Sequence, residues 1–319
     1  MHRNAVVRLA AGRALWSVFV LWLVSVLIFL ATHVLPGDAA TAILGLQATP
    51  EATRALEEQL HLNDSLISQY TTWLLSALQL DFGVSFSNGL DVAGYLVPTL
   101  VNSLSLMLGA AVIGIPLSLG LGLLTGYRRD GALDGTVTVL TLVLAALPVF
   151  VVGAMLVVIF STGTLSLLPA IVTEPATLSN VGSWTLPAVT LALAIAPYII
   201  RMMRATTVEI LESEFVTYAR LRGMRERTII LLHTLPNTLG PVSQVLALQL
   251  AYLFGGAVVV EYLFAYPGIG AALIDAVHNR DVPVLQAICM FIGAFYVLLN
   301  LIADIVTILA TPKLRLPSR

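Results

Sequence analysis

Long apolar runs alternate with short polar segments along most of the chain. Six of these runs approach or exceed the roughly 20 residues that an α-helix needs to cross a lipid bilayer. They occupy residues 15–35, 100–126, 136–160, 186–202, 241–260 and 284–310. The fourth run is the shortest, and we expect Pro197 to interrupt it. The pattern predicts an all-α integral membrane protein with six transmembrane helices.

The composition agrees with this class of protein. Hydrophobic residues make up 58% of the 319 positions, charged residues make up 11%, and the mean hydropathy is +0.93. A soluble domain has about 25% charged residues, so roughly half of the usual charge is missing. The formal net charge of -2 gives no broad basic surface for nucleic acid. The single cysteine, Cys289, can form no intrachain disulfide and is interpreted as a small buried apolar side chain.

Basic residues gather on one side of the predicted membrane. Fourteen of the 16 lysines and arginines lie in the N-terminal segment, the second-to-third connection, the fourth-to-fifth connection or the C-terminal tail, and only Arg54 and Arg280 lie opposite. The positive-inside rule then places both termini in the cytoplasm. The apolar part of the first run, about 20 residues, exceeds the roughly 7–15 of a signal-peptide core, so we expect an uncleaved anchor.

Residues 36–97 are therefore predicted to form a long outward loop that contains short helices. Thr49, Pro50 and Glu51 favour the start of a first helix, because a capping hydroxyl, a proline and an acidic residue suit a first turn. The stretch "NDSLISQYTTWLLSALQL" predicts a second helix, capped by Asn63 or Asp64. The loop is acidic, which fits either a docking face for an external partner or an ordinary solvated loop.

The segment "YARLRGMRERTIILLHTLPN" interrupts this apolar pattern within the predicted cytoplasmic stretch 203–240. Four arginines at the centre of a membrane span would cost on the order of 10 kcal/mol, so the segment must lie in water or against another protein. Apolar residues interspersed with the charges predict short amphipathic helices separated by a turn at Gly223. We expect Pro236 and Pro241 to end the second of these helices before the fifth span begins.

Three interpretations of this charged segment remain open from the residues alone. It could be a plain cytoplasmic loop whose charge only sets orientation. It could be a helix that binds anionic lipid, although nearby glutamates dilute its positive charge. It could also be a docking element whose helix enters a partner's groove while its arginines pair with acidic groups at the rim.

Several classes of activity lack their sequence signatures. No G-x-x-x-x-G-K-[ST] phosphate loop occurs, and the glycines of "GLGLLTG" are better explained by close helix packing. No histidine or serine signature of a hydrolase is present, so we predict no catalytic residue and no metal site. A self-sufficient channel or secondary transporter stays as the alternative, although neither inverted repeats nor several charged midplane residues are visible.

A resemblance to a known family emerges from the spacing of these motifs. Gly223, nine intervening residues and "HTLP" resemble the EAA loop of permease subunits in ATP-binding-cassette importers, with Thr217, Tyr218 and Ala219 at the E-A-A positions and His233 in place of isoleucine. The stretch "FVTYARLRG" resembles the variant of this EAA loop that is typical of the dipeptide/oligopeptide/nickel permease family. "HVLPGDAATAILG", "SQYTTWLLSALQLDFGVSF" and "GGAVVVEYLFAYPGIGAALIDAVHNRDVPVLQ" resemble further motifs of the same family, in its B-type member.

This resemblance implies a single transmembrane permease domain over residues 1–319 in a bacterial inner membrane. Its implied partners are a second permease, two cytoplasmic ATPase domains that use ATP and Mg, an extracytoplasmic binding protein, a peptide substrate and lipid, with no nucleic acid and no cofactor bound by this chain. The residues implied to couple to the ATPases are Tyr218, Ala219, Arg220, Gly223, Met224, Arg225, Glu226 and Arg227. Gly223 would set the turn, Met224 would enter the ATPase cleft and the arginines would hold its rim.

A second group of residues is assigned to the translocation path or to an outer loop. It comprises Glu261, Tyr266, Pro267, Gly268, Gly270, Asn300 and Asp304. By resemblance, Glu261 is expected to face the exit of the conduit. The "PGIG" stretch is either a contact for substrate or binding protein or a tight re-entrant turn. Asn300 and Asp304 share one face of the sixth helix, where they serve the path or bond to another helix. The cargo, whether a dipeptide, a longer peptide, a nickel chelate or a heme-like compound, is not distinguished.

Overall fold

The fold is mainly helical in the residues that the computed structural model describes, which are 2–34, 49–51, 53–54, 64–162 and 167–310. Within these ranges the extended structure is one isolated bridge between Val84 and Asp91. Five described helices are long and apolar enough to cross a membrane, and a bent pair of helices would make a sixth. The predicted class of all-α integral membrane protein is confirmed.

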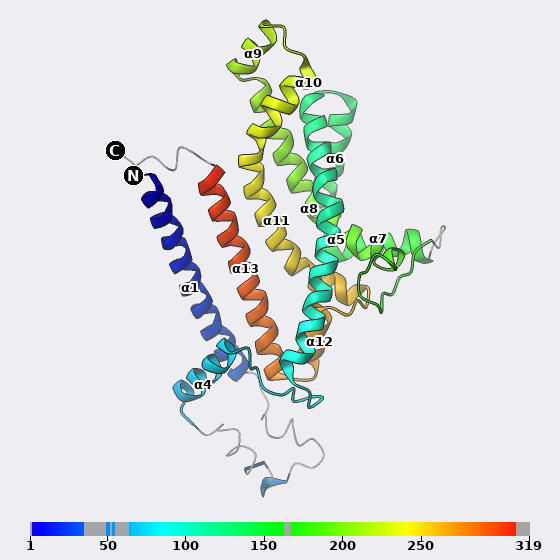
Figure 1. Ribbon diagram of the computed structural model, residues 1–319. Helices are drawn as coiled ribbons and strands as arrows, with labels where there is room; N and C mark the ends of the chain where they lie inside the picture. The colour runs from blue at the N-terminus through cyan, green and yellow to red at the C-terminus, as the bar shows by residue number, and fades with distance from the viewer. Residues whose placement is uncertain (1, 35–48, 52, 55–63, 163–166, 311–319) are drawn as a thin grey trace.

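The long helices lie side by side in an elongated bundle, with short helices at both of its ends (Figure 1). The long helices are α1 (His2–Val34), α5 (Val92–Tyr127), α8 (Val181–Leu211), α11 (Leu235–Leu263) and α13 (Val282–Ala310). The shorter ones are α4 (Leu66–Leu78), α6 (Ala132–Ala146), α7 (Val149–Val157), α9 (Glu214–Leu221), α10 (Glu226–Thr228) and α12 (Ile269–His278). Helices α9 and α10 stand at one end, and α4 and α12 stand at the other (Figure 1).

The third predicted span, 136–160, is not one straight helix. Helix α6 ends at Ala146, and the next helical segment leaves at 107° after a break at Leu147 and Pro148. A proline disfavours the helical conformation of the residue before it, and Leu147 is accordingly extended, with φ -89° and ψ 133°. Helix α7 therefore projects sideways from the bundle (Figure 1), and a π-helical turn, Val158–Thr162, follows it.

Prolines do not break the helices of the fourth and fifth spans, so the interruptions predicted there are wrong. Helix α8 runs unbroken past Pro197, which lies inside it. The helical stretch Glu226–Leu263 likewise continues past Pro236 and Pro241, through a π-helical turn at Ile229–Thr234. Neighbouring helices and local π adjustments can satisfy the backbone groups that a proline leaves free in a packed span.

Helix boundaries also shift at the predicted outer loop. Helix α5 begins at Val92 rather than 100, because the Asp91 carboxylate caps it by accepting the Gly94 N–H at 2.7 Å. The predicted second outer helix is present as α4, and its cap is Ser65 rather than Asn63 or Asp64. Of the predicted first helix, residues 50, 51, 53 and 54 are helical, and the remainder lies outside the described residues.

Helices α5 and α8 pack closely because glycines on α5 face α8. A Cβ atom at Gly122 would lie 2.6 Å from the Met203 Cβ, and one at Gly126 would lie 2.7 Å from the Thr207 Cβ. Gly120, two residues before Gly122, has nothing within 4 Å of its Cβ position. The expected packing role of "GLGLLTG" is therefore confirmed at Gly122 and Gly126, where small residues let two helix backbones approach.

This contact predicts opposite results for two neighbouring substitutions. Gly122→Leu should lower the free energy of unfolding by about 2 kcal/mol, because the new side chain forces α5 away from α8. Gly120→Leu, its matched control, should leave stability unchanged or raise it by about 0.8 kcal/mol through helix propensity. Unfolding in mixed micelles measures both. Equal losses in the two variants would mean that the α5–α8 contact is not close at Gly122.

Helix α1 is the most exposed of the long helices, and α13 is its neighbour. Only 11% of the most apolar window of α1 is buried, against 67% for α8. Arg13 on α1 pairs with Asp304 at 3.1 Å, and Gln286 on α13 donates to Thr32 at 2.7 Å. Asn300 donates to the Tyr296 carbonyl on its own helix. Asp304 thus bonds to another helix, while Asn300 bonds within α13.

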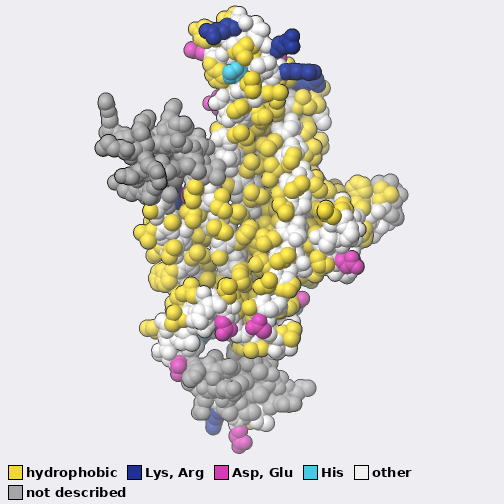
Figure 2. Space-filling view, viewed as in Figure 1, with side chains coloured by type: hydrophobic (Ala, Val, Ile, Leu, Met, Phe, Trp, Pro, Cys, Tyr) yellow, Lys and Arg dark blue, Asp and Glu magenta, His cyan; other side chains and the backbone are white. Residues whose placement is uncertain are grey.

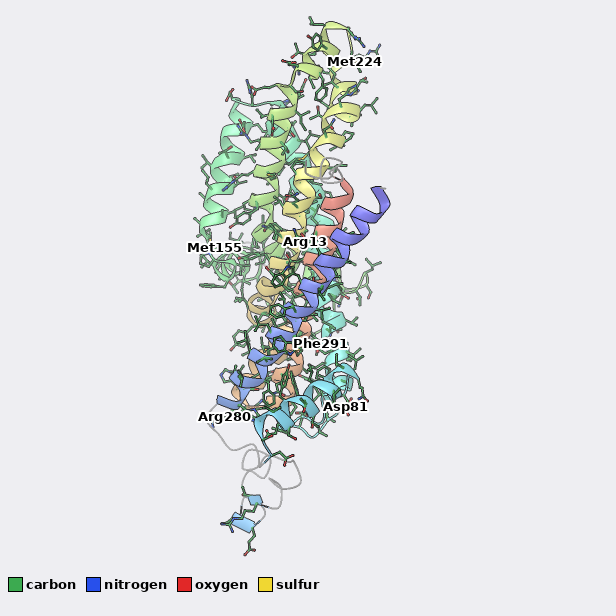
Figure 3. The ribbon with its side chains drawn as sticks, turned by 90° about the vertical axis from the view of Figure 1, so that its left-hand side faces the viewer. Arg13, Asp81, Met155, Met224, Arg280 and Phe291 are labelled. Atoms are coloured by element: carbon green, nitrogen blue, oxygen red, sulfur yellow. The ribbon has the colours of Figure 1, made fainter. Side chains whose placement is uncertain are left out.

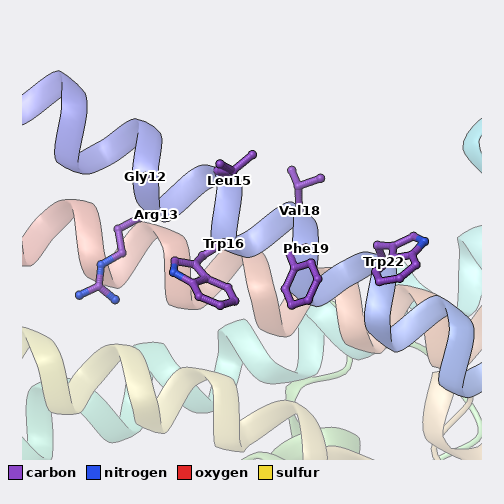
Figure 4. A pocket seen from close by; sticks show the side chains of 7 residues that line it. All are labelled: Gly12, Arg13, Leu15, Trp16, Val18, Phe19 and Trp22. Carbon is purple, nitrogen blue, oxygen red and sulfur yellow. The ribbon is translucent and has the colours of Figure 1, made fainter.

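An apolar groove of about 800 Å³ runs along the outer face of α1 (Figure 4). Trp16 and Phe19 extend from the same side of the helix in this view, and their rings meet edge to face at 5.4 Å. Such an aromatic surface suits the lipid environment of a membrane helix.

Candidate functional site

The charged segment forms a helical hairpin at one end of the bundle. Helix α9 ends at Leu221, and Gly223 follows with a left-handed φ of +77°. The Gly223 N–H donates to the Arg220 carbonyl at 2.9 Å, and the Met224 N–H donates to the Ala219 carbonyl at 3.2 Å. These bonds form a glycine cap at the end of a helix. The predicted break at Gly223 and the short amphipathic helix before it are confirmed, whereas the helical stretch after it is not short, because it continues from Glu226 to Leu263.

A small hydrophobic core holds this hairpin together. Val216 and Ile229 are fully buried, and Ala219 is 8% exposed. Ile210 and Leu211 from the end of α8, together with Met224, pack against these three residues. The core joins α8, α9 and the turn before α11, so the hairpin is fixed to two long helices. Met224 stands at the far end of the bundle (Figure 3) but is half-buried against this core.

The polar face of the hairpin is basic. Arg220 pairs with Glu226 across the turn, Nε to Oε1 at 2.8 Å, and this hydrogen bond raises the pKa of the Arg220 guanidinium above its usual value. Arg222, Arg225 and Arg227 are exposed and make no ion pair with any described residue. Basic side chains gather at this end of the molecule, and acidic ones lie mainly toward the other (Figure 2). The hairpin therefore presents unpaired positive charge.

An exposed apolar stripe lies beside these arginines. Phe215, Tyr218 and Leu221 are spaced three residues apart on α9 and are 45%, 65% and 78% exposed. The buried residues Val216 and Ala219 occupy a different face of the same helix. Tyr218 was among the predicted residues, whereas Phe215 and Leu221 were not. The i, i+3, i+6 spacing is the signal that identifies them, because residues three apart share a helix face.

Five residues of the second predicted group gather at the opposite end of the bundle, around the turn between α11 and α12, whereas Asn300 and Asp304 lie in the C-terminal half of α13. Tyr266 is fully buried, and its hydroxyl donates to the Asn102 carbonyl at 2.8 Å and accepts the Ala176 N–H at 3.0 Å. The Asn102 amide donates to the Pro267 carbonyl, also at 2.8 Å. These bonds tie the turn to α5 and to the segment before α8. The "PGIG" stretch thus forms a tight turn, and its expected contact with substrate or binding protein stays a prediction.

Glu261 is placed differently from the expectation. Its side chain is fully buried, and its carboxylate accepts the Gly270 N–H at 2.7 Å. Gly268 lies so close to this carboxylate that a Cβ atom would not fit. The prediction that Glu261 faces the exit of a conduit is therefore wrong, because the turn at Gly268 and Gly270 covers it. Its described contacts make it an anchor for the turn.

A second junction at this end was missed by sequence reasoning. The side chain of Asp281 is buried, with Asp281 2% exposed. Its carboxylate accepts one hydrogen bond from the Ser85 hydroxyl and one from the Ser87 hydroxyl, the second at 2.8 Å. It also accepts the Phe86 N–H at 3.1 Å and the Ser87 N–H at 3.3 Å. The "DFGVSF" and "NRDVP" motifs are thus one structural unit, although almost 200 residues separate them. Asp81 and Arg280 mark this end in Figure 3.

A polar pocket of about 380 Å³ opens beside Asp281. Its polar lining includes Ser87, Asn88, Tyr95, Asp275 and Asn279. Among the described residues, no group of three or more histidines, cysteines and acidic residues lies together as a metal site would require.

Comparisons with known proteins cover nearly the whole chain. Residues 118–316 match the family "Binding-protein-dependent transport system inner membrane component", and residues 6–107 match "Binding-prot-dependent transport system membrane comp, N-term". The nickel import system permease protein NikB of Staphylococcus aureus strain USA300 is 34% identical over 307 residues, which cover 95% of this chain and 90% of that protein. NikB of strain bovine RF122 is similar to the same extent.

Proposed function

Because the chain belongs to the family of binding-protein-dependent transport system inner membrane components, as a permease subunit of an ABC importer, we propose that it forms half of a translocation path for peptides. It works in the cell inner membrane as a multi-pass protein. A second permease completes the path, two ATPase domains act from the cytoplasm and a binding protein delivers cargo from outside. Transport proceeds by alternating access, with no chemistry on the cargo.

The exposed stripe on α9 is the observation that carries this proposal. A cytoplasmic helix that exposes Phe215, Tyr218 and Leu221 beside unpaired arginines has the composition of a docking surface, in which apolar anchors bury and a polar rim surrounds them. The hydrophobic core beneath fixes the stripe to α8 and α11. Motion of a bound ATPase would therefore move two long helices directly.

The interpretation of the charged segment as a plain cytoplasmic loop accounts for less of this geometry. A loop that only sets membrane orientation needs no exposed apolar stripe and no core of its own. Membership of this family argues against a self-sufficient channel or secondary transporter, because an ABC importer draws its energy from a separate ATPase.

A charge placed in the stripe should release the ATPase. We expect Leu221→Asp to weaken copurification of the ATPase with the tagged chain roughly thirtyfold, because a central interface anchor contributes about 2 kcal/mol. Leu178→Asp is the matched control, since Leu178 is 92% exposed and lies near the other end. Quantitative mass spectrometry of the purified complexes measures both. Equal recovery of the ATPase from both variants would contradict the assignment of α9 as the coupling helix.

Peptides and nickel are the two cargo classes to separate. The motif resemblance is the basis for proposing peptide cargo, while the NikB relatives, named as nickel import permeases, favour nickel as a second candidate. Uptake of a radiolabelled dipeptide and of ⁶³Ni, compared in cells with and without this chain, distinguishes them. Chain-dependent dipeptide uptake that excess nickel does not reduce supports peptide cargo. Chain-dependent ⁶³Ni uptake alone would overturn it.

A further inference from the structure

The corner between α5 and α6, residues 128–134, lies against the last turns of α8. Asp134 in the first turn of α6 is 4% exposed and meets Arg204 of α8 in a two-point ion pair. The Arg204 Nε lies 2.5 Å from Oδ1 and its terminal nitrogen 2.7 Å from Oδ2. Two parallel bonds fix both the distance and the angle between two planar groups. The pair thus sets the orientation of α8 relative to α6.

The Asp134 carboxylate also organises its own corner. It accepts the Asp130 N–H at 3.0 Å, so it closes the turn that leads into α6. The N-cap of this helix, Gly131, supplies no side-chain hydrogen bond. A carboxylate in a first turn is favoured by the helix dipole. Asp134 therefore joins the start of α6, the preceding turn and α8 through a single side chain.

A second ion pair of reversed polarity lies further along. Arg129 in the corner pairs with Glu212, the residue that directly follows α8. Both partners are about half exposed, so this pair alone contributes little stability. Together, however, the two pairs define one register of the corner along α8, because a shifted alignment would leave the buried Asp134 without its arginine. The corner thus contacts α8 at Arg204 and again just beyond its end, at Glu212.

The end of α8 leads directly into the coupling helix. Only Glu212 and Ser213 separate α8 from α9, and Ile210 and Leu211 pack into the core of the hairpin. On its other side, α8 lies against Gly126 of α5, where a Cβ would meet the Thr207 side chain and the Arg204 carbonyl. Helices α5, α6 and α8 therefore meet at this end of the bundle, directly beneath α9.

We propose that Asp134 and Arg204 are positioning residues that brace α8 against α6, so that displacement of α9 moves α5, α6 and α8 as one body. This inference rests on the proposed function, because it concerns how movement at an ATPase contact enters the membrane. The brace sets how completely ATP hydrolysis is converted into transport.

Distance measurement on the full chain tests the brace without any partner. Cys289→Ser first removes the only native cysteine. Spin labels are then attached at two exposed positions, Thr136→Cys on α6 and Tyr218→Cys on α9. In lipid nanodiscs, we expect one narrow distance distribution that Asp134→Asn broadens about twofold, because an amide cannot form both bonds to Arg204.

Asp130→Asn is the matched control for this variant. Asp130 is 86% exposed at its side chain and has a left-handed φ of +63°, a conformation that asparagine tolerates. The control should keep the narrow distribution. An unchanged width in Asp134→Asn, with the labelled chain folded, would overturn the brace.

Coupling is measured separately in the assembled transporter. In Asp134→Asn we expect uptake per ATP hydrolysed to fall about tenfold while hydrolysis persists, the tenfold corresponding to about 1.4 kcal/mol of coupling. A purely structural role would not change this ratio. Parallel loss of uptake and hydrolysis would overturn the positioning role. If the unmodified chain copurifies with no ATPase, the proposed function fails, and the spin-label distances still decide the brace.

Discussion

Gly223→Pro is expected to abolish uptake while leaving the chain in the membrane. Gly223 has a φ of +77°, and proline fixes φ near about -65°, so the glycine cap of α9 cannot form. The substitution also removes the N–H that donates to the Arg220 carbonyl. Displacement of α9 should remove interface contacts worth about 3 kcal/mol, which weakens ATPase binding roughly a hundredfold.

Gly89→Pro provides a matched control at the other end of the bundle. Gly89 has a φ of +71°, and its N–H donates to the Ser85 carbonyl at 3.0 Å, so proline introduces the same conflict there. Membrane insertion, copurified ATPase and uptake are measured for both variants. We expect Gly89→Pro to retain its ATPase and Gly223→Pro to lose it. Normal uptake by Gly223→Pro would mean that the turn plays no part in coupling.

Asp281→Ala is expected to lower the free energy of unfolding by about 3 kcal/mol. The substitution leaves the buried Ser85 hydroxyl without its acceptor, and an unsatisfied buried group costs about 1–3 kcal/mol. The partly buried Ser87 hydroxyl and two backbone N–H groups lose the same acceptor. The loop before α5 would then separate from the start of α13. Unfolding of the purified chain in mixed micelles measures the change.

Asp275→Ala is the control for this second prediction. Asp275 lies on α12 and lines the same polar pocket, but it is exposed. A surface substitution of this kind changes stability by only about 0.5 kcal/mol. A similar loss in both variants would show that general acidity at this end, rather than the bonds of Asp281, stabilises the junction.

The sequence predicted the class of fold because membrane spans depend on local composition. Apolar length and charge marked the long helices, and Gly223 marked the turn of the hairpin. Breaks within spans were predicted less well, because the effect of a proline depends on its neighbours. Pro148 bends the chain by 107°, whereas Pro197 and Pro241 remain inside continuous helices that pack against others.

The candidate site was predicted in part for a similar reason. The arginines and Gly223 are recognisable within one short segment. The partners of Asp281 and Asp134 lie far away in the chain, so no local pattern connects Asp281 with Ser85 or Asp134 with Arg204. The burial of Glu261 was missed because the turn that covers it folds back from the residues after α11.

Photo-crosslinking from the tip of α9 tests the central claim most directly. A photo-reactive residue replaces Leu221, which is more exposed than Met224, in the tagged chain purified from its native membrane. The same residue at Leu178 serves as the control. We predict a crosslink from position 221 alone to an ATPase that carries a nucleotide-binding motif, in a complex with a second permease. Crosslinks only to lipid or to the chain itself, in an intact and monodisperse sample, would contradict the claim that α9 couples this permease to its ATPase.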